Sequence, residues 1–252
     1  MATSAAKLRS AYQLQLSVLK GLGFPVEPGS TVLDFGCGAG LAIRYLQEQG
    51  FDAYGYDVQN KSESHTDQTD LIEGGILRIN TDGNLPLPFP DDMFDIVLSY
   101  QVFEHVQNYE HSVAELARIL KPGGVSLHVF PSRYRPLEAH NGVPFSPLLP
   151  YRRWLEFWIR LGFHRKRDSG KSWQKVLEWD DYFLKNRTNY IPGKEIRRHF
   201  SAHFRKVEFV QKEYLLRSDR LRGLEKAVRL TPLLPAMFGT FWTRVLLAAA
   251  PE

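Results

Sequence analysis

The stretch Val32-Leu-Asp-Phe-Gly-Cys-Gly-Ala-Gly40 decides how this sequence folds. Its apolar beginning, Thr31–Phe35, has the composition of a short buried strand, and three glycines follow at alternate positions. Residues without a Cβ let the chain turn sharply and let its backbone approach a ligand closely. Leu41–Gln49 then shows the apolar spacing of a helix. The pattern predicts a strand, a glycine-rich ligand-binding turn and a helix.

Strands and helices alternate over the first 130 residues. Further strands are predicted over Ala53–Asp57, Ile76–Asn80, Phe94–Ser99 and Val125–Phe130, and further helices over Ser10–Gly21 and Ser112–Leu120. This alternation is typical of an α/β fold with a doubly wound, mostly parallel sheet. Such sheets bind ligands at the carboxyl ends of their strands, near the point where the strand order reverses.

The alternation breaks after Phe130 and resumes near Gly193. Residues 131–192 are rich in proline, aromatic and basic residues, and we predict two helices there, Tyr151–Leu161 and Ser172–Leu184. We expect a helical cap insertion whose tryptophans, Trp154, Trp158, Trp173 and Trp179, pack on the body. The rest is predicted as helix Gly193–Phe204, strand Lys206–Gln211, helix Ser218–Leu230 and strand Phe241–Ala249. The whole chain, 1–252, is thus predicted as one domain, with a cofactor-binding half at 1–130, the insertion at 131–192 and sheet completion at 193–252.

The composition, 43% apolar and 24% charged over 252 residues, is ordinary for a globular protein and excludes a collagen, a long disordered chain and a disulfide-rich miniprotein. Cys37 is the only cysteine, so an intrachain disulfide and a multi-cysteine metal site are excluded. No secretory signal is apparent at Met1–Lys7, and the apolar run Leu230–Thr243, 14 residues long, is too short to span a bilayer. These features favour a cytoplasmic protein, with peripheral membrane contact left open.

The charge is unevenly distributed along the chain. Residues 1–130 hold 8 basic and 16 acidic residues, whereas residues 131–252 hold 24 and 12. Either the solvated faces simply differ, or the basic second half meets an anionic substrate or surface.

Two carboxylates flank the glycine turn. Asp34 precedes the glycines, where it could meet a cationic amine, and Asp57 ends the next strand, 17 residues after Gly40. A carboxylate in the second position can accept hydrogen bonds from both hydroxyls of a ribose. A purely structural turn with two solvated acids is the alternative, and the combination of turn and acids favours binding. The glycine spacing is not the G-x-G-x-x-G of dinucleotide sites, which weakens the case for a nicotinamide-dependent oxidoreductase.

The stretch 32–40 resembles the first motif of class I S-adenosylmethionine-dependent methyltransferases. The resemblance continues, in the same order, at Asp82–Asp95, Ser99–Val106 and Leu116–Gly124. Small-molecule methyltransferases, including those of the ubiquinone pathway, share this pattern. It implies a Rossmann-like sheet of seven strands, S-adenosylmethionine as cofactor and S-adenosylhomocysteine as product. The resemblance stops before 131–192, where such enzymes usually select their substrate.

The resemblance also implies a set of cofactor-binding residues: Asp34, Gly36, Cys37, Gly38, Gly40, Asp57, Val58, Asp82, Gly83, Ser99 and Gln101. The turn would cradle the amino-acid part of the cofactor, and Asp57 would hold the ribose with Val58 beside the adenine. Asp82 and Gly83 would meet the adenine edge, although Asn80 could take the place of Asp82. Ser99 and Gln101 would lie near the sulfonium and carboxylate end. Tyr12 either closes over the cofactor or, as we favour, is a packed aromatic residue.

Methyl transfer needs a base only when the acceptor atom has a proton to lose. His105 and, on the insertion, His140 are the candidates, because imidazole titrates near neutrality. The alternative for His105 is that it and Glu104 cap or orient the following helix. No tight ligand spacing around Glu138 and His140 supports a metal site, so no metal is expected.

The segment 144–167 mixes bulky apolar residues with arginines. Its apolar face either packs over the active site with the arginines in solvent, which we favour, or lies on anionic lipid or a phosphorylated or lipid-linked substrate. Nucleic acid is disfavoured because the basic residues are dispersed. The predicted reaction is methyl transfer to O, N or C of a small-molecule or lipid-linked acceptor. A nicotinamide-dependent oxidoreductase and a non-catalytic cofactor-binding module are the alternatives.

Overall fold

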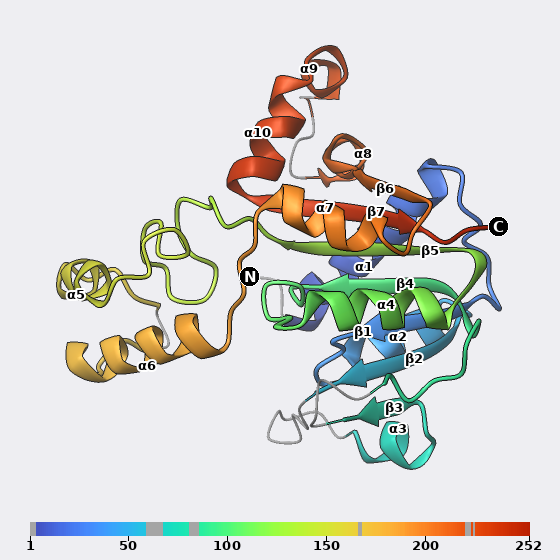
Figure 1. The fold of residues 1–252 in the computed structure, drawn as a ribbon, viewed down its shortest axis with the longest axis horizontal. Coiled ribbons are helices and arrows are strands. Elements are labelled where there is room, and N and C mark those ends of the chain that lie inside the picture. The colour runs from blue at the N-terminus through green and yellow to red at the C-terminus, as the bar shows by residue number, and fades with distance from the viewer. Residues whose placement is uncertain (1–3, 59–67, 81–85, 166–167, 220–222, 224) are drawn as a thin grey trace.

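The structure, a computed structural model, describes residues 4–58, 68–80, 86–165, 168–219, 223 and 225–252 (Figure 1). Within these residues the chain forms a seven-stranded sheet in the order β3-β2-β1-β4-β5-β7-β6. The strands are β1 Thr31–Phe35, β2 Asp52–Asp57, β3 Leu77–Ile79, β4 Phe94–Tyr100, β5 Leu120–Pro131, β6 Lys206–Phe209 and β7 Thr243–Ala249. Strands β1 to β5 are parallel and β7 runs antiparallel to both β5 and β6. The predicted doubly wound, mostly parallel sheet is therefore confirmed, and its strand order reverses between β1 and β4.

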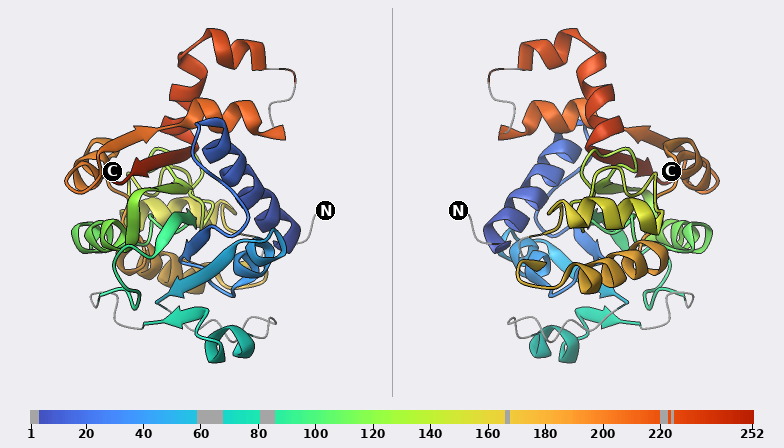
Figure 2. Two further views of the ribbon diagram at one scale, coloured as in Figure 1. Left: turned by 90° about the vertical axis from the view of Figure 1, so that its right-hand side faces the viewer. Right: turned by 90° about the vertical axis from the view of Figure 1, so that its left-hand side faces the viewer.

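Helices cover both faces of the sheet, as Figure 2 shows for α1 and α4 on opposite sides. The face of Val32 packs against α1 (Ser4–Gly21), α2 (Leu41–Glu48), α3 (Thr69–Glu73) and α8 (Gln211–Arg217). The face of Leu33 packs against α4 (Tyr109–Ile119) and α7 (Gly193–Ser201). Burial on both faces explains why the central strands are nearly continuous apolar runs.

The insertion contains α5 (Arg152–Arg160) and α6 (Trp173–Asn186), close to their predicted positions. These two helices share a small core of their own, made of Val143, Leu155, Ile159, Val176, Leu177 and Leu184. The expectation that the tryptophans pack on the body is wrong: Trp154, Trp158 and Trp173 pack on this small core, and Trp179 is 51% exposed. The helix pair lies beyond the carboxyl ends of the parallel strands (Figure 1).

The C-terminal part differs from its prediction at four boundaries. Helix α7, predicted to end at Phe204, ends at Ser201. Strand β6 ends at Phe209, because Gln211 already begins α8, which buries Tyr214 and Leu215. The helix predicted from Ser218 is wrong at its start, since α9 covers only Glu225–Leu230. The last strand begins two residues later than predicted, because Leu233–Phe241 forms α10. Pro232 at the N-cap of α10 suits a helix start, where a missing N–H costs nothing.

Among the residues that the structure describes, no helix is long and apolar enough to cross a membrane.

Candidate functional site

The glycine turn after β1 has the backbone conformation that its sequence predicts. Gly36, Gly38 and Gly40 have φ angles of 81°, 55° and 74°, a region that side chains rarely adopt. A Cβ on Gly36 would lie 2.4 Å from Cγ2 of Val102, and one on Gly40 would lie 2.6 Å from Cδ1 of Leu71. A side chain at either position would therefore force Val102 or Leu71 to move, whatever the turn binds.

Strand β2 supplies the partners of the turn. The N–H groups of Gly36 and Cys37 donate to the Tyr56 carbonyl, at 2.8 and 3.1 Å, and the N–H of Gly38 donates to Asp57 Oδ2 at 2.8 Å. These hydrogen bonds hold the turn against the end of β2. The structure brings the buried carboxylate of Asp57 to the turn, as the sequence predicts.

Asp34 lies at the end of β1 and is 1% exposed. The Tyr12 hydroxyl donates to Asp34 Oδ1, whereas Asp34 Oδ2 has no hydrogen-bond partner in the described structure. Burial raises the pKa of Asp34 to about 7, although the bond from Tyr12 acts in the opposite direction and the nearby charge of Asp57 raises the pKa further. Tyr12 is itself buried, which agrees with its favoured role as a packed aromatic residue. The orphaned oxygen beside the glycine turn suits the ammonium group of an amino acid.

Of the other residues implied by the resemblance, Ser99 lies differently from the expectation. It is fully buried, and its Oγ is 2.9 Å from Nδ1 of His128, whose pKa burial lowers to about 3. A hydroxyl enclosed in this way does not line a ligand site. Gln101 directly follows β4 with a φ of 61°, and its N–H donates to the Val129 carbonyl at 2.8 Å.

The residues assigned to the adenine end are only partly described. Val58 is 42% exposed, and the N–H of Asn80 donates to the Asp57 carbonyl at 3.1 Å. Asn80 therefore lies beside the acid assigned to the ribose. Asp82 and Gly83 lie outside the described residues.

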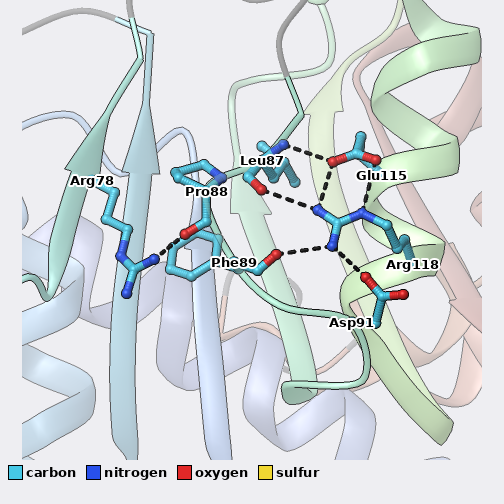
Figure 3. Close-up of polar contacts among 7 residues, drawn as sticks. All are labelled: Arg78, Leu87, Pro88, Phe89, Asp91, Glu115 and Arg118. Carbon is cyan, nitrogen blue, oxygen red and sulfur yellow. Dashed lines mark hydrogen bonds and ion pairs between the residues drawn. The ribbon is translucent and has the colours of Figure 1, made fainter.

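Sequence reasoning did not single out Arg118 of α4, which holds the chain segment entering β4 (Figure 3). Arg118 donates to the Leu87 carbonyl (3.0 Å), the Phe89 carbonyl (2.9 Å), Asp91 Oδ1 (2.7 Å) and both oxygens of Glu115 (2.9 and 2.7 Å). Glu115 Oε2 also accepts from the Leu87 N–H at 2.7 Å, and Arg78 donates to the Pro88 carbonyl. These bonds fix the chain directly after the segment that contains Asp82.

His105 and His140, which are 35 residues apart in sequence, lie together with their ring centroids 4.8 Å apart. The buried carboxylate of Glu104 lies between them: its Oε1 is 3.9 Å from Nε2 of His105 and 3.7 Å from Nε2 of His140. Glu138 instead organises the loop of the insertion, because it accepts from the N–H groups of His140 and Asn141 and from the Tyr190 hydroxyl. The site thus has a glycine turn with two acids and, after β4, a Glu–His–His cluster.

Comparison with known proteins agrees with this arrangement. The family model described as "Methyltransferase domain" matches residues 33–127. The chain is 34% identical over 102 residues to 2-methyl-6-phytyl-1,4-hydroquinone methyltransferase of Synechocystis sp., covering 40% of this chain and 31% of that protein. It is 36% identical over 101 residues to ubiquinone biosynthesis O-methyltransferase of Paramagnetospirillum magneticum, covering 38% and 39%. The matches thus span about a third of the length of these curated relatives.

Solved structures support the fold. Haemonchus contortus phosphoethanolamine N-methyltransferase 2, in complex with phosphomonomethylethanolamine and S-adenosylhomocysteine, aligns with a TM-score of 0.54 at 16% identity, covering 96% of this chain and 53% of that one. A putative sarcosine dimethylglycine methyltransferase from Galdieria sulphuraria aligns with a TM-score of 0.52 at 17% identity, covering 98% and 87%.

The sheet order, the glycine turn and the matched segment define a class I S-adenosylmethionine-dependent methyltransferase domain. Residues 33–127 of this chain match the family model of such a domain, which confirms the resemblance found in the sequence. S-adenosylmethionine is the cofactor of such a domain. The residues fit it: Asp34 next to the glycine turn has a carboxylate oxygen without a hydrogen-bond partner, which suits an ammonium group, and the carboxylate of Asp57 lies at the turn.

Proposed function

We propose that this chain transfers the methyl group of S-adenosylmethionine to O, N or C of a small-molecule or lipid-linked acceptor. The observation that carries the proposal is the glycine turn with Asp34 and Asp57 at the carboxyl ends of the neighbouring parallel strands β1 and β2. When bound, the cofactor supplies a methyl group that its sulfonium already activates. The protein must then bind the acceptor, orient it toward the methyl group and exclude water. This orientation carries much of the barrier reduction.

Each part of the cofactor has a proposed partner. Asp34 holds the amino group and the surface of Gly36, Gly38 and Gly40 accommodates the amino-acid moiety. Asp57 holds the ribose, and the adenine lies beside Val58 with its edge toward Asn80 or Asp82 and Gly83. Gln101, directly after β4, lies on the side of the sulfonium.

Where the acceptor atom carries a proton, we assign its removal to the histidines after β4. His105 and His140 lie side by side, and Phe183 of α6 contacts both rings, with centroids 5.9 and 5.2 Å away. An aromatic wall next to the two imidazoles supports a pocket from which water is partly excluded.

A lipid-linked acceptor is supported by the surface of the insertion. Leu155 and Ile159 of α5 are buried in the core shared with α6, so the opposite side of α5 is exposed, with Phe157 at 53%. The residues at the two ends of the helix are exposed as well, Tyr151 at 68% and Leu161 at 58%. Arg153 is exposed beside these residues. Apolar side chains interleaved with arginines suit contact with an anionic lipid surface. One curated relative is named for a phytyl hydroquinone, a lipid-linked ring.

Calorimetric titration with S-adenosylhomocysteine tests the cofactor assignment, with NAD as the control ligand. We expect one S-adenosylhomocysteine per chain and no heat from NAD. Heat from NAD alone would instead support the oxidoreductase alternative.

Transfer of a radiolabelled methyl group to a quinol panel with and without isoprenoid tails then tests the acceptor. Turnover on none of these quinols would count against this class of acceptor.

Co-sedimentation with phosphatidylglycerol vesicles tests the membrane contact. The double variant Phe157→Ser with Leu161→Ser should lose binding, whereas Ile72→Ser, which removes a 39% exposed apolar side chain from α3, should not. Equal sedimentation of all three proteins would exclude this surface as the contact.

A further inference from the structure

The cluster of Glu104, His105 and His140 has the make-up of a metal site. Each residue offers one ligand atom, and the three atoms lie within 4.8 Å of one another. We propose that these residues bind a divalent transition-metal ion of the zinc type. Two of the ligands, Glu104 and His105, are consecutive in the segment after β4, and the third, His140, comes from the insertion.

The carboxylate of Glu104 needs a positive partner. Its side chain is fully buried, and neither of its oxygens has a hydrogen-bond partner in the described structure. The nearest imidazole nitrogens, at 3.7 and 3.9 Å, are beyond hydrogen-bond range. Burying an ionised carboxylate without hydrogen bonds or a bound cation is expensive. A cation between Glu104 and the two rings would remove that cost.

His105 is already oriented as a metal ligand. Its Nδ1 lies 2.6 Å from the carbonyl oxygen of Arg187. A carbonyl can only accept, so Nδ1 carries the hydrogen, and in the neutral ring Nε2 presents its lone pair toward Glu104. Metal-bound histidines usually donate their second N–H to a carbonyl or carboxylate in this manner. Without a cation, the lone pair of His105 Nε2 and the Glu104 carboxylate, which are both hydrogen-bond acceptors, would face each other.

The loop that carries His140 is held in place by Glu138. Glu138 Oε2 accepts from the backbone N–H of His140 at 2.5 Å and from that of Asn141 at 2.6 Å, and Glu138 Oε1 accepts from the Tyr190 hydroxyl at 2.6 Å. The third ligand is therefore positioned by a buried network rather than by a free loop.

The distances suit a small ion. Nitrogen and oxygen ligands lie about 2.0–2.1 Å from zinc, so ligand atoms in a tetrahedral site are roughly 3.3–3.4 Å apart. To close the site, the two glutamate–histidine distances of 3.7 and 3.9 Å would shorten by about half an ångström. The two histidine nitrogens, which lie within 4.8 Å of each other, would approach by up to about 1.4 Å. Two histidines with one carboxylate are the donor set of zinc and related transition ions, whereas magnesium and calcium prefer oxygen ligands.

Three protein ligands leave a coordination position open for water or for an oxygen of the acceptor. A metal ion makes a coordinated hydroxyl easier to deprotonate, so it would replace the histidines as the means of removing the acceptor's proton. This consequence depends on the proposed methyl transfer, but the binding of the ion does not.

The test is zinc binding by the full chain after removal of metals with a chelator, followed by competition with a chromogenic chelator. We expect one ion per chain. Glu104→Gln and His140→Ala should each weaken binding by at least about tenfold, since each removes a ligand. His164→Ala, which removes a histidine of the insertion outside the cluster, should leave the affinity unchanged.

Cobalt(II) gives a second readout, because its visible absorption is strong in a tetrahedral protein site and weak in the hydrated ion, and the strong absorption should be lost in His105→Ala. Circular dichroism checks that each variant is folded. Zinc binding by Glu104→Gln with wild-type affinity, or no stoichiometric binding by the wild type, would overturn the proposal and leave a buried carboxylate–imidazolium pair. S-adenosylhomocysteine titration of the same variants separates this failure from a failure of the proposed function.

Discussion

The side chain of Asp57 and the backbone N–H of Gly38 are joined by a 2.8 Å hydrogen bond that links the end of β2 to the turn after β1. The acid assigned to the cofactor ribose therefore also fixes the turn. A substitution at this position acts on both parts of the site.

Asp57→Asn should weaken S-adenosylhomocysteine binding by about tenfold or more. The amide loses the charge, and a hydrogen bond to a charged group contributes roughly 1.5–3 kcal/mol, where 1.4 kcal/mol corresponds to a factor of ten. Calorimetry measures the loss, and Asp52→Asn, at the exposed start of the same strand, is the matched control. Equal affinities of the two variants would contradict the assignment of Asp57.

Gly36→Ala should lower the stability by more than Gly23→Ala does. Both glycines have positive φ angles, 81° and 87°, so both substitutions carry the backbone strain of roughly 1–2 kcal/mol. Only at Gly36 does the new Cβ also meet Val102, because nothing lies within 4 Å of a Cβ at Gly23. The difference between the two unfolding free energies, measured in urea, isolates this overlap, and we expect about 1–3 kcal/mol. A difference near zero would mean that Val102 moves aside freely.

Much of this site could be predicted from the sequence because its signals are local. Strand β1, the glycine turn and Asp57 are each recognised within a few residues, and parallel pairing then brings Asp57 to the turn. The enclosure of Ser99 by His128 could not be predicted, because it depends on the register in which β4 pairs with β5, which places Ser99 opposite His128. The same holds for the Glu104–His140 contact, since no spacing along the chain reveals residues that only the insertion brings together. At the C-terminus, the segments that form α8 and α10 have no decisive periodicity, so tertiary packing determines where β6 ends and β7 begins.

Asp34 should make the protein less stable as the pH rises. Its pKa is raised by burial to about 7, so in the unfolded chain, where the ordinary value of 3.8 applies, the carboxyl loses its proton more easily. Asp34 therefore contributes to the free energy of unfolding in full below about pH 4, and this contribution is lost as the pH rises through about 7. Its size is roughly 1.4 kcal/mol per unit of pKa difference between the folded and unfolded states. Asp34→Asn removes the effect, so its stability relative to wild type should increase between pH 5 and pH 8 in urea unfolding.

Asp95 provides the opposite control for that experiment. Burial alone would raise the pKa of Asp95, but bonds from Lys121 and from the Thr31 N–H outweigh it and lower the pKa. The stability that Asp95 contributes is therefore present above its unfolded pKa and lost as the pH falls through the lower folded value. Asp95→Asn should be destabilised relative to wild type at pH 7 and less so in acid. The same trend for both variants would contradict the environments described for the two acids.

A substitution of Arg118 in α4 should loosen the segment that enters β4 and lower the stability of the protein. It bonds to two carbonyls and two carboxylates, and its planar guanidinium can reach all of them at once (Figure 3). Arg118→Lys keeps the charge but not this geometry, and we expect a loss of about 1–3 kcal/mol in urea unfolding together with faster amide exchange over residues 86–91. Arg198→Lys is the control. The side chain of Arg198 is 72% exposed, and its ion pair with Glu195 is long, at 3.8 Å. Exposed pairs of this kind contribute little to stability. If Arg118→Lys were as stable as Arg198→Lys and exchange over 86–91 were unchanged, the segment would be held by β4 and Arg78 alone, without the guanidinium.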